Sequence, residues 1–214
     1  MAFLNIDGCR SDSVDEKTGR LETALRKNLV ISRVLDRAPL LKLPNWYLGA
    51  GCIAQTVWNE LHSFPPSNHI KDYDLVYFDG SDLSYEAEDM RIKGGRKLFR
   101  DLNARIEIRN QARVHLWYKK HFSKTLEYLD DYGKTNSAYK TVEDAIATWP
   151  TTATSIGVKL DEEKRFVVYA PFGLDDLFDM VVRPNKKGVP KEVYLGKVER
   201  WTKIWPRLKV VPWD

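Results

Sequence analysis

Three acidic residues are placed where carboxylates could bind divalent cations. Asp72 and Asp74 belong to the apolar segment Asp-Tyr-Asp-Leu-Val-Tyr-Phe, and Glu107 belongs to the alternating segment Arg-Ile-Glu-Ile-Arg. Side chains alternate along a strand, so Asp72 and Asp74 should project from one face. Two carboxylates on one face repel each other unless a cation lies between them, and oxygen ligands suit hard divalent ions. With Glu107 on a neighbouring strand, the three acids would bind two Mg²⁺ ions, an arrangement that serves phosphoryl transfer.

A glycine-containing turn precedes these acids. The short apolar segment Trp46-Tyr47-Leu48 ends at the turn, and a helical pattern follows it. Glycine lets the backbone approach a ligand closely, and a helix N-terminus offers unpaired N–H groups and partial positive charge to a phosphate. Arg109 and Arg113, which follow Glu107, could reach a phosphate or a base. The predicted nucleotide-binding residues are therefore Gly49, Ala50, Gly51, Cys52, Arg109 and Arg113.

Each of these signals also has a simpler interpretation. A Gly-x-Gly sequence is often only a tight turn, and an Asp-x-Asp sequence is often only solvated. Arg105 and Arg109 share the face of Glu107 and could simply pair with it. A surface salt bridge would explain Arg113 equally well. The order of the signals along successive elements is what favours a site.

Apolar periodicity predicts the helices and strands of an α+β fold with a C-terminal α+β extension. We expect residues 1–18 to be a mobile tail, residues 19–122 to form the core, and residues 123–214 to pack on that core as one compact unit. Gly94-Gly95 should interrupt the helix at 85–102. In the core, we expect helices at 19–36, from the turn to about 62, at 85–102 and from 110 to about 122, and strands at 46–48, 72–78 and 105–109.

The extension should contain shorter elements. Asp161-Glu162-Glu163 is the predicted turn of a hairpin, and Trp201 and Trp205 have the four-residue spacing of core residues on one helix. Its predicted helices span 142–148, 174–180 and 191–205, and its predicted strands span 154–160, 165–169 and 208–212.

Composition limits the class of protein. The hydrophobic content of 43% can bury a core, and no apolar run approaches the roughly 18 residues that a membrane span needs. Two cysteines cannot build a disulfide framework, which agrees with a reducing compartment. We therefore expect a cytoplasmic protein, with a nuclear location also compatible, and no membrane partner.

Charge is unevenly distributed along the chain. Residues 68–89 contain seven acids and one lysine, whereas residues 181–214 contain nine basic residues and three acids. The two segments could bind metal cations and phosphates respectively, although two solvated faces would show the same pattern.

The motifs resemble those of the DNA polymerase beta-like nucleotidyltransferases. Leu48-Gly49-Ala50-Gly51, Asp72-Tyr73-Asp74 and Glu107 are similar to the glycine turn, the paired aspartates and the third carboxylate of that superfamily. Longer segments, including Ile106 to His115 and Phe172 to Leu177, resemble a small family of predicted nucleotidyltransferases of unknown substrate. Ala50 separates the two glycines, and Cys52 stands where a phosphate-binding hydroxyl is usual.

This resemblance implies the nucleotidyltransferase fold, in which a mixed sheet is flanked by helices. It also implies that Asp72, Asp74 and Glu107 are metal ligands. The leading hypothesis is a Mg²⁺-dependent enzyme, with Mn²⁺ able to substitute. It would transfer a nucleoside monophosphate from a nucleoside triphosphate such as ATP to a small molecule, a protein or an RNA end, and release pyrophosphate. The alternatives are a catalytically silent nucleotide- or RNA-binding module and a metal-dependent phosphohydrolase. The sequence does not decide the acceptor, the preferred base or the oligomeric state.

Overall fold

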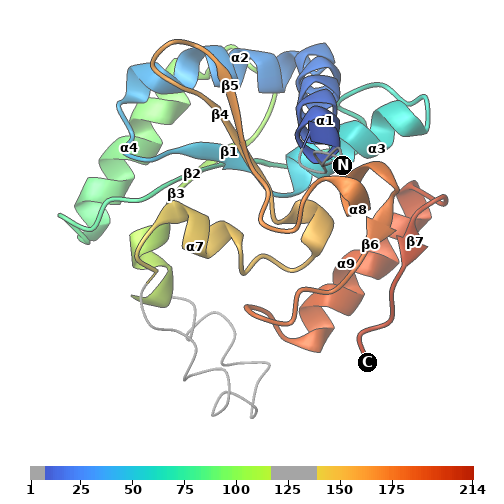
Figure 1. The fold of residues 1–214 in the computed structure, drawn as a ribbon. Coiled ribbons are helices and arrows are strands. Elements are labelled where there is room, and N and C mark those ends of the chain that lie inside the picture. Colours follow the sequence, from blue (N-terminus) through green and yellow to red (C-terminus); the bar gives the residue numbers. More distant parts are fainter. Residues whose placement is uncertain (1–7, 117–138) are drawn as a thin grey trace, which may run out of the picture.

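A five-stranded mixed sheet forms the centre of the protein. The computed structural model describes residues 8–116 and 139–214 (Figure 1). The strand order is β3-β2-β1-β4-β5, in which β2 and β3 are parallel and the other neighbours are antiparallel. The strands are β1 (Tyr47–Gly49), β2 (Tyr73–Tyr77), β3 (Ile106–Asn110), β4 (Gly157–Leu160) and β5 (Phe166–Tyr169). The predicted α+β class with a mixed sheet is confirmed.

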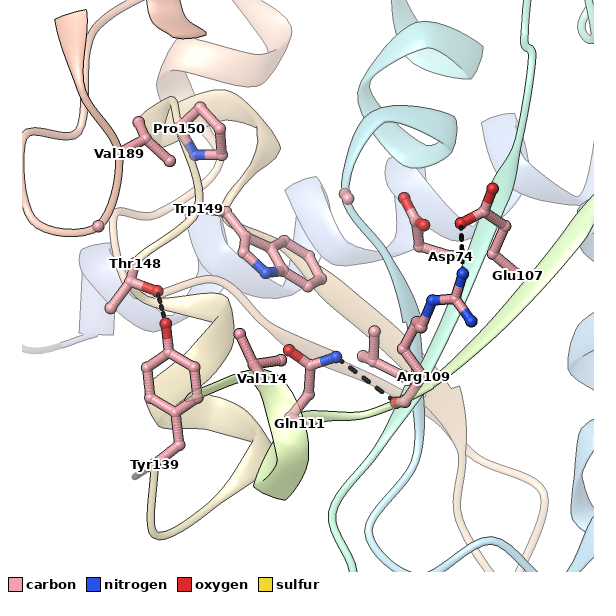
Figure 2. A pocket seen from close by; sticks show the side chains of 13 residues that line it. Asp74, Glu107, Arg109, Gln111, Val114, Tyr139, Thr148, Trp149, Pro150 and Val189 are labelled. Atoms are coloured by element: carbon pink, nitrogen blue, oxygen red, sulfur yellow. Dashed lines mark hydrogen bonds and ion pairs between the residues drawn. The ribbon is translucent and has the colours of Figure 1, made fainter. Parts of the chain in front are cut away.

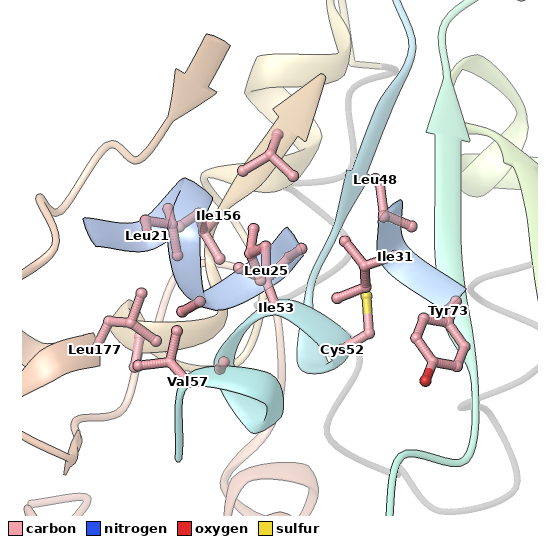
Figure 3. Close-up of a cluster of buried hydrophobic side chains, with 14 of the residues drawn as sticks. Leu21, Leu25, Ile31, Leu48, Cys52, Ile53, Val57, Tyr73, Ile156 and Leu177 are labelled. Atoms are coloured by element: carbon pink, nitrogen blue, oxygen red, sulfur yellow. The ribbon is translucent and has the colours of Figure 1, made fainter. Parts of the chain in front are cut away.

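Helices cover both faces of this sheet. The main core lies on the face covered by the N-terminal helices, where Leu21, Ile31, Ile53 and Leu48 belong to one buried cluster (Figure 3). On the opposite face, a smaller cluster joins α7 (Val142–Ile146) to Tyr47 and Val76. The helices of the first half are α1 (Gly8–Lys27), α2 (Leu29–Arg37), α3 (Gly51–Leu61) and α4 (Tyr85–Leu98), with the 3₁₀ turns η1 (Ala38–Leu41) and η2 (Gln111–Arg113).

The N-terminal helices differ from the prediction. Residues 8–18, predicted to be a mobile tail, are helical, and the predicted single helix at 19–36 is divided at Asn28. The buried Asn28 side chain accepts hydrogen bonds from the N–H groups of Val30 and Ile31 and donates one to the Thr56 hydroxyl. Apolar periodicity continues across this break, so the pattern could not show it.

Helix α4 also differs, because it runs through Gly94-Gly95 without interruption. A Cβ atom at Gly95 would lie 2.0 Å from the Ile108 Cδ1 atom of β3. Gly95 is therefore the point at which α4 approaches the sheet edge. Helix α4 ends at Leu98 rather than at residue 102.

The C-terminal part completes the core. Trp201 and Trp205 are almost fully buried and pack edge-on against Trp58 of α3, with ring centroids 5.3 and 5.6 Å apart. Their predicted core placement is confirmed, as is the hairpin of β4 and β5. The elements are α7, η3 (Thr152–Thr154), α8 (Asp175–Phe178), β6 (Val181–Val182), α9 (Lys191–Ile204) and β7 (Lys209–Val210). The predicted helix toward residue 122 lies outside the described residues beyond 116.

Within the described ranges, none of the helices is both long enough and apolar enough to cross a membrane.

The close contact at Gly95 predicts a difference between two alanine substitutions. Gly94→Ala should stabilise the protein by up to about 1 kcal/mol, because alanine is the better helix former and a Cβ there would meet only Leu41 at 3.8 Å. Gly95→Ala gains the same propensity but overpacks against Ile108, so it should be less stable than Gly94→Ala by about 1–3 kcal/mol. Urea unfolding of both variants measures this difference. Equal stabilities would contradict the assigned contact.

Candidate active site

The pairing of three strands places Gly49, Asp74 and Glu107 in one row. Gly49 of β1 is opposite Asp74 of β2, and Asp74 is opposite Glu107 of β3. Residues opposite each other project from the same face of a sheet. Figure 2 shows the Asp74 and Glu107 side chains next to each other, on the sheet face that α7 covers.

Asp72 lies just before β2 rather than within it, yet its charge acts on Asp74. Burial raises the pKa of Asp74 to about 7, and the negative charges of Asp72 and Glu107 raise it further, while Lys197 and Arg109 oppose the increase. The three predicted ligands are therefore electrostatic neighbours. In the part of the chain that the structure describes, no group of three or more His, Cys, Asp or Glu side chains is arranged to hold a metal ion.

Glu107 makes ion pairs with both arginines that share its face. The Arg105 Nη2 atom is 2.5 Å from one Glu107 oxygen, and the Arg109 Nη2 atom is 3.8 Å from the other. The pairing that the sequence suggested as an alternative is thus present. The Arg105 side chain is 71% exposed, and exposed pairs contribute at most about 1 kcal/mol, so a ligand could displace it at small cost.

The turn between β1 and α3 has a different physical basis from the predicted one. A Cβ atom at Gly49 would lie 2.5 Å from the Ile156 carbonyl oxygen and 2.9 Å from the Trp149 ring. Gly49 is needed for packing within the protein. Ala50 has a φ of 60°, a left-handed value that glycine adopts more easily, and its side chain does not cap α3. The first N–H groups of α3 receive no cap from Ala50.

Cys52 does not present its side chain to a ligand. Its thiol is buried in the main core and donates a hydrogen bond to the Gly49 carbonyl at 3.1 Å (Figure 3). Burial raises the pKa of this thiol. The nucleotide contact of Cys52 stays a prediction, and its backbone N–H at the start of α3 is the group that could make it.

The Arg113 side chain makes its contacts within the protein. Its guanidinium pairs with Glu88 of α4 and donates a hydrogen bond to the Leu83 carbonyl at 2.9 Å. Glu88 also accepts a hydrogen bond from the Asn110 N–H at 2.8 Å. Arg113 is not among the residues that line the cavity beside the acids, and its nucleotide contact stays a prediction.

A cavity of about 290 Å³ opens beside Asp74 and Glu107 (Figure 2). Ala50 lines it near the turn, and Trp149 and Gln111 line it farther from the acids. Neither Trp149 nor Gln111 was predicted from the sequence to be a site residue. Trp149 follows a short helix without apolar periodicity, and Gln111 follows a strand as one polar residue among several, so neither gave a signal. The remaining lining residues are Val76, Arg109, Val114, Tyr139, Thr148, Pro150, Gly188 and Val189.

Lys197 of α9 brings positive charge to the acids. Burial and the charge of Arg200 lower the pKa of Lys197, and the charges of Asp74 and Asp72 partly offset this decrease. Asp72 also lines a smaller cavity of about 40 Å³ together with Lys71 and Arg200. The sequence showed only that residues 181–214 are basic, because α9 lies more than a hundred residues from Asp72 and Asp74.

The fold, together with the comparisons that follow, defines an enzyme of the transferase class that acts on nucleotides. A family model described as nucleotidyltransferase matches residues 36–210, so the chain belongs to this nucleotidyltransferase family. A search of the curated proteins finds no match.

One solved structure supports the same assignment. It was determined by NMR, is described as revealing a CCA-adding enzyme head domain, and is 25% identical to this chain. The TM-score is 0.68, and the match covers 89% of this chain and 94% of the other. The predicted superfamily and the predicted transferase class are confirmed.

Arg109 and Arg113 should differ in their effect on stability. Arg113→Met leaves Glu88 charged and unpaired in a buried position, since the two side chains are only 11% and 9% exposed, and should cost about 3–5 kcal/mol. Arg109→Met removes the 3.8 Å ion pair with Glu107, in which the Arg109 side chain is 43% exposed, and should lower the free energy of unfolding by less than about 1 kcal/mol. Chemical unfolding compares them. If Arg113→Met retained full stability but weakened nucleotide binding, Arg113 would be a ligand contact after all.

Proposed function

We propose that the protein transfers a nucleoside monophosphate from a nucleoside triphosphate to an acceptor hydroxyl in the presence of Mg²⁺, and releases pyrophosphate. The observation that supports this most strongly is the row of Gly49, Asp74 and Glu107 across three paired strands. This row lies between the start of α3, which suits phosphates, and a cavity large enough for part of a nucleotide. Membership of the nucleotidyltransferase family supports the same chemistry.

The donor set suits Mg²⁺, and Mn²⁺ should be able to substitute. Asp72, Asp74 and Glu107 offer hard carboxylate oxygens, and their mutual repulsion is a force that a divalent cation would relieve. When bound, the metal would neutralise phosphate charge and lower the pKa of the attacking hydroxyl. Arg105 is exposed and could leave Glu107 when the cation arrives.

The residues of the chain would then have separate tasks. The N–H groups at Gly51 and Cys52, together with Lys197, would hold the triphosphate, and Arg109 would add positive charge beside Glu107. Glu107 would accept the proton of the acceptor hydroxyl. The hydroxyl oxygen attacks the α-phosphorus, a new P–O bond forms, and the bond to the bridging oxygen breaks so that pyrophosphate leaves.

For the acceptor, we place the end of an RNA first among the candidates. The basis is the similarity to the structure described as a CCA-adding enzyme head domain. Small-molecule and protein hydroxyls are the next candidates. A catalytically silent nucleotide- or RNA-binding module is the second proposal, because Glu107 is paired with Arg105 and Arg109 and the turn contains Ala50.

Asp74→Asn should abolish the proposed reaction while the protein stays folded. The substitution removes the central carboxylate, and the loss should be about 100-fold or more in the rate of pyrophosphate release from ATP, CTP, GTP or UTP with Mg²⁺ and an RNA acceptor. The matched control is Asp101→Asn, which changes an exposed acid that pairs with Arg37. Circular dichroism verifies the fold of both variants.

Unchanged turnover in Asp74→Asn would reject the assignment of the acids. If wild-type protein bound nucleotide equally with and without Mg²⁺ and released no pyrophosphate, the silent binding module would be the correct description. Release of orthophosphate or monophosphate without an acceptor would instead indicate a phosphohydrolase.

A further inference from the structure

The end of the cavity away from the acids contains the amide side chain of Gln111. Gln111 is only 6% exposed and lines the cavity. Its Nε2 atom donates a long hydrogen bond of 3.5 Å to the Arg109 carbonyl. Because a contact of this length is at the limit of hydrogen-bond distance, the amide can exchange it for a shorter hydrogen bond to a polar ligand in the cavity.

Trp149 is held rigidly in the wall of the same cavity. Its carbonyl oxygen accepts hydrogen bonds from Asn185 Nδ2 at 2.9 Å and from the Ser155 hydroxyl at 3.2 Å. Asn185 Nδ2 also donates to the Ala147 carbonyl at 2.8 Å, so one buried amide fixes this segment at two points. One edge of the Trp149 ring packs on Gly49, and the ring is partly exposed where it lines the cavity.

The surrounding wall is apolar at this end and charged at the other. Val114 and Pro150 lie around the aromatic end, where Tyr139 and Thr148 hydrogen-bond to each other, whereas Asp74 and Glu107 form the acidic end (Figure 2). An apolar slot with an aromatic ring and one oriented amide suits a flat heteroaromatic ring. Because Ala50 at the start of α3 lines the same cavity, phosphates bound there would direct the rest of a nucleotide toward Trp149 and Gln111.

We propose that this cavity binds the nucleobase of the incoming nucleoside triphosphate, stacked on Trp149 and recognised along its edge by Gln111. This inference rests on the proposed function and adds its base-binding subsite. An amide presents one donor and one acceptor, as base edges do, so the site selects among bases. Stacking on Trp149 supplies affinity for any base, and Gln111 supplies the preference.

The test measures binding of ATP, CTP, GTP, UTP and inorganic tripolyphosphate to the full chain by calorimetry. Wild-type protein should prefer one nucleotide. Trp149→Ala should lower the affinity for all four nucleotides by about 5- to 100-fold, the range that corresponds to the loss of one base–tryptophan stack. The affinity for tripolyphosphate should stay unchanged. Trp149→Phe should retain most of the affinity. Trp213→Ala, which removes a tryptophan that packs on Tyr194 outside the cavity, should change neither.

Substitutions of Gln111 test recognition separately. Gln111→Glu replaces the amide donor by a second acceptor, so it should favour guanine, whose N1–H and N2–H₂ are adjacent donors, and disfavour uracil. Gln111→Leu should reduce the differences among the four nucleotides. These variants and Trp149→Phe keep the proposal testable even if Trp149→Ala does not fold.

The outcomes separate the two proposals. If the four nucleotides bound equally to wild-type protein, or if folded Trp149→Ala kept the wild-type affinity for them, the base site would be rejected. An unchanged preference in Gln111→Glu would also reject it. Loss of turnover in Asp74→Asn would leave the transferase assignment standing in each of these cases. A parallel loss of tripolyphosphate affinity in Gln111→Glu would also reject the base site, because the two subsites would not be separate. No nucleotide binding by wild-type protein would reject both.

Discussion

Repulsion among acids held close together by strand pairing is the constraint from which the site follows. Asp74 is on the central strand of the three, and hydrogen bonding to β1 and β3 fixes Gly49 on one side and Glu107 on the other. Two effects reduce the repulsion. Burial and the neighbouring acids raise the pKa of Asp74, so that this carboxyl is more readily protonated, and Arg105 and Arg109 partly neutralise the charge of Glu107. The sheet therefore holds the carboxyl groups of Asp74 and Glu107 in a mutually repulsive arrangement that a bound cation would stabilise.

The positive charge opposite these acids depends on the hydrophobic core. Trp201 and Trp205 of α9 pack against Trp58 of α3, and Trp205 Nε1 donates a hydrogen bond to Asn59 at 2.8 Å. This contact joins α9 to the helix that begins at the glycine turn. Lys197, one turn before Trp201, lies with its Nζ atom 5.5 Å from the centre of the Trp201 ring. Core packing thus places a lysine where it acts electrostatically on Asp74 and Asp72.

The sequence predicted the features that depend on local pattern. The strand of Asp74, the strand of Glu107, the turn before α3 and the β4–β5 hairpin follow from alternation and turn residues, and the structure has them at nearly the same bounds. Features that depend on contacts between distant segments could not be predicted. Asn28 breaks a helix through a hydrogen bond to Thr56, and Gly95 is required by Ile108.

The same reason applies at the site. The sequence could not show that Arg113 pairs with Glu88 or that the Cys52 side chain faces the core. Trp149 and Gln111 could be found only after folding, because they reach the cavity from segments far apart in the chain.

The most direct test of the central claim is a titration of Mn²⁺ monitored by electron paramagnetic resonance, in the presence of a nonhydrolysable triphosphate. The account predicts saturable binding by wild-type protein that is lost in Asp74→Asn and strongly weakened in Glu107→Gln. Equal Mn²⁺ affinity in wild-type protein and both variants would show that these carboxylates are not the metal site.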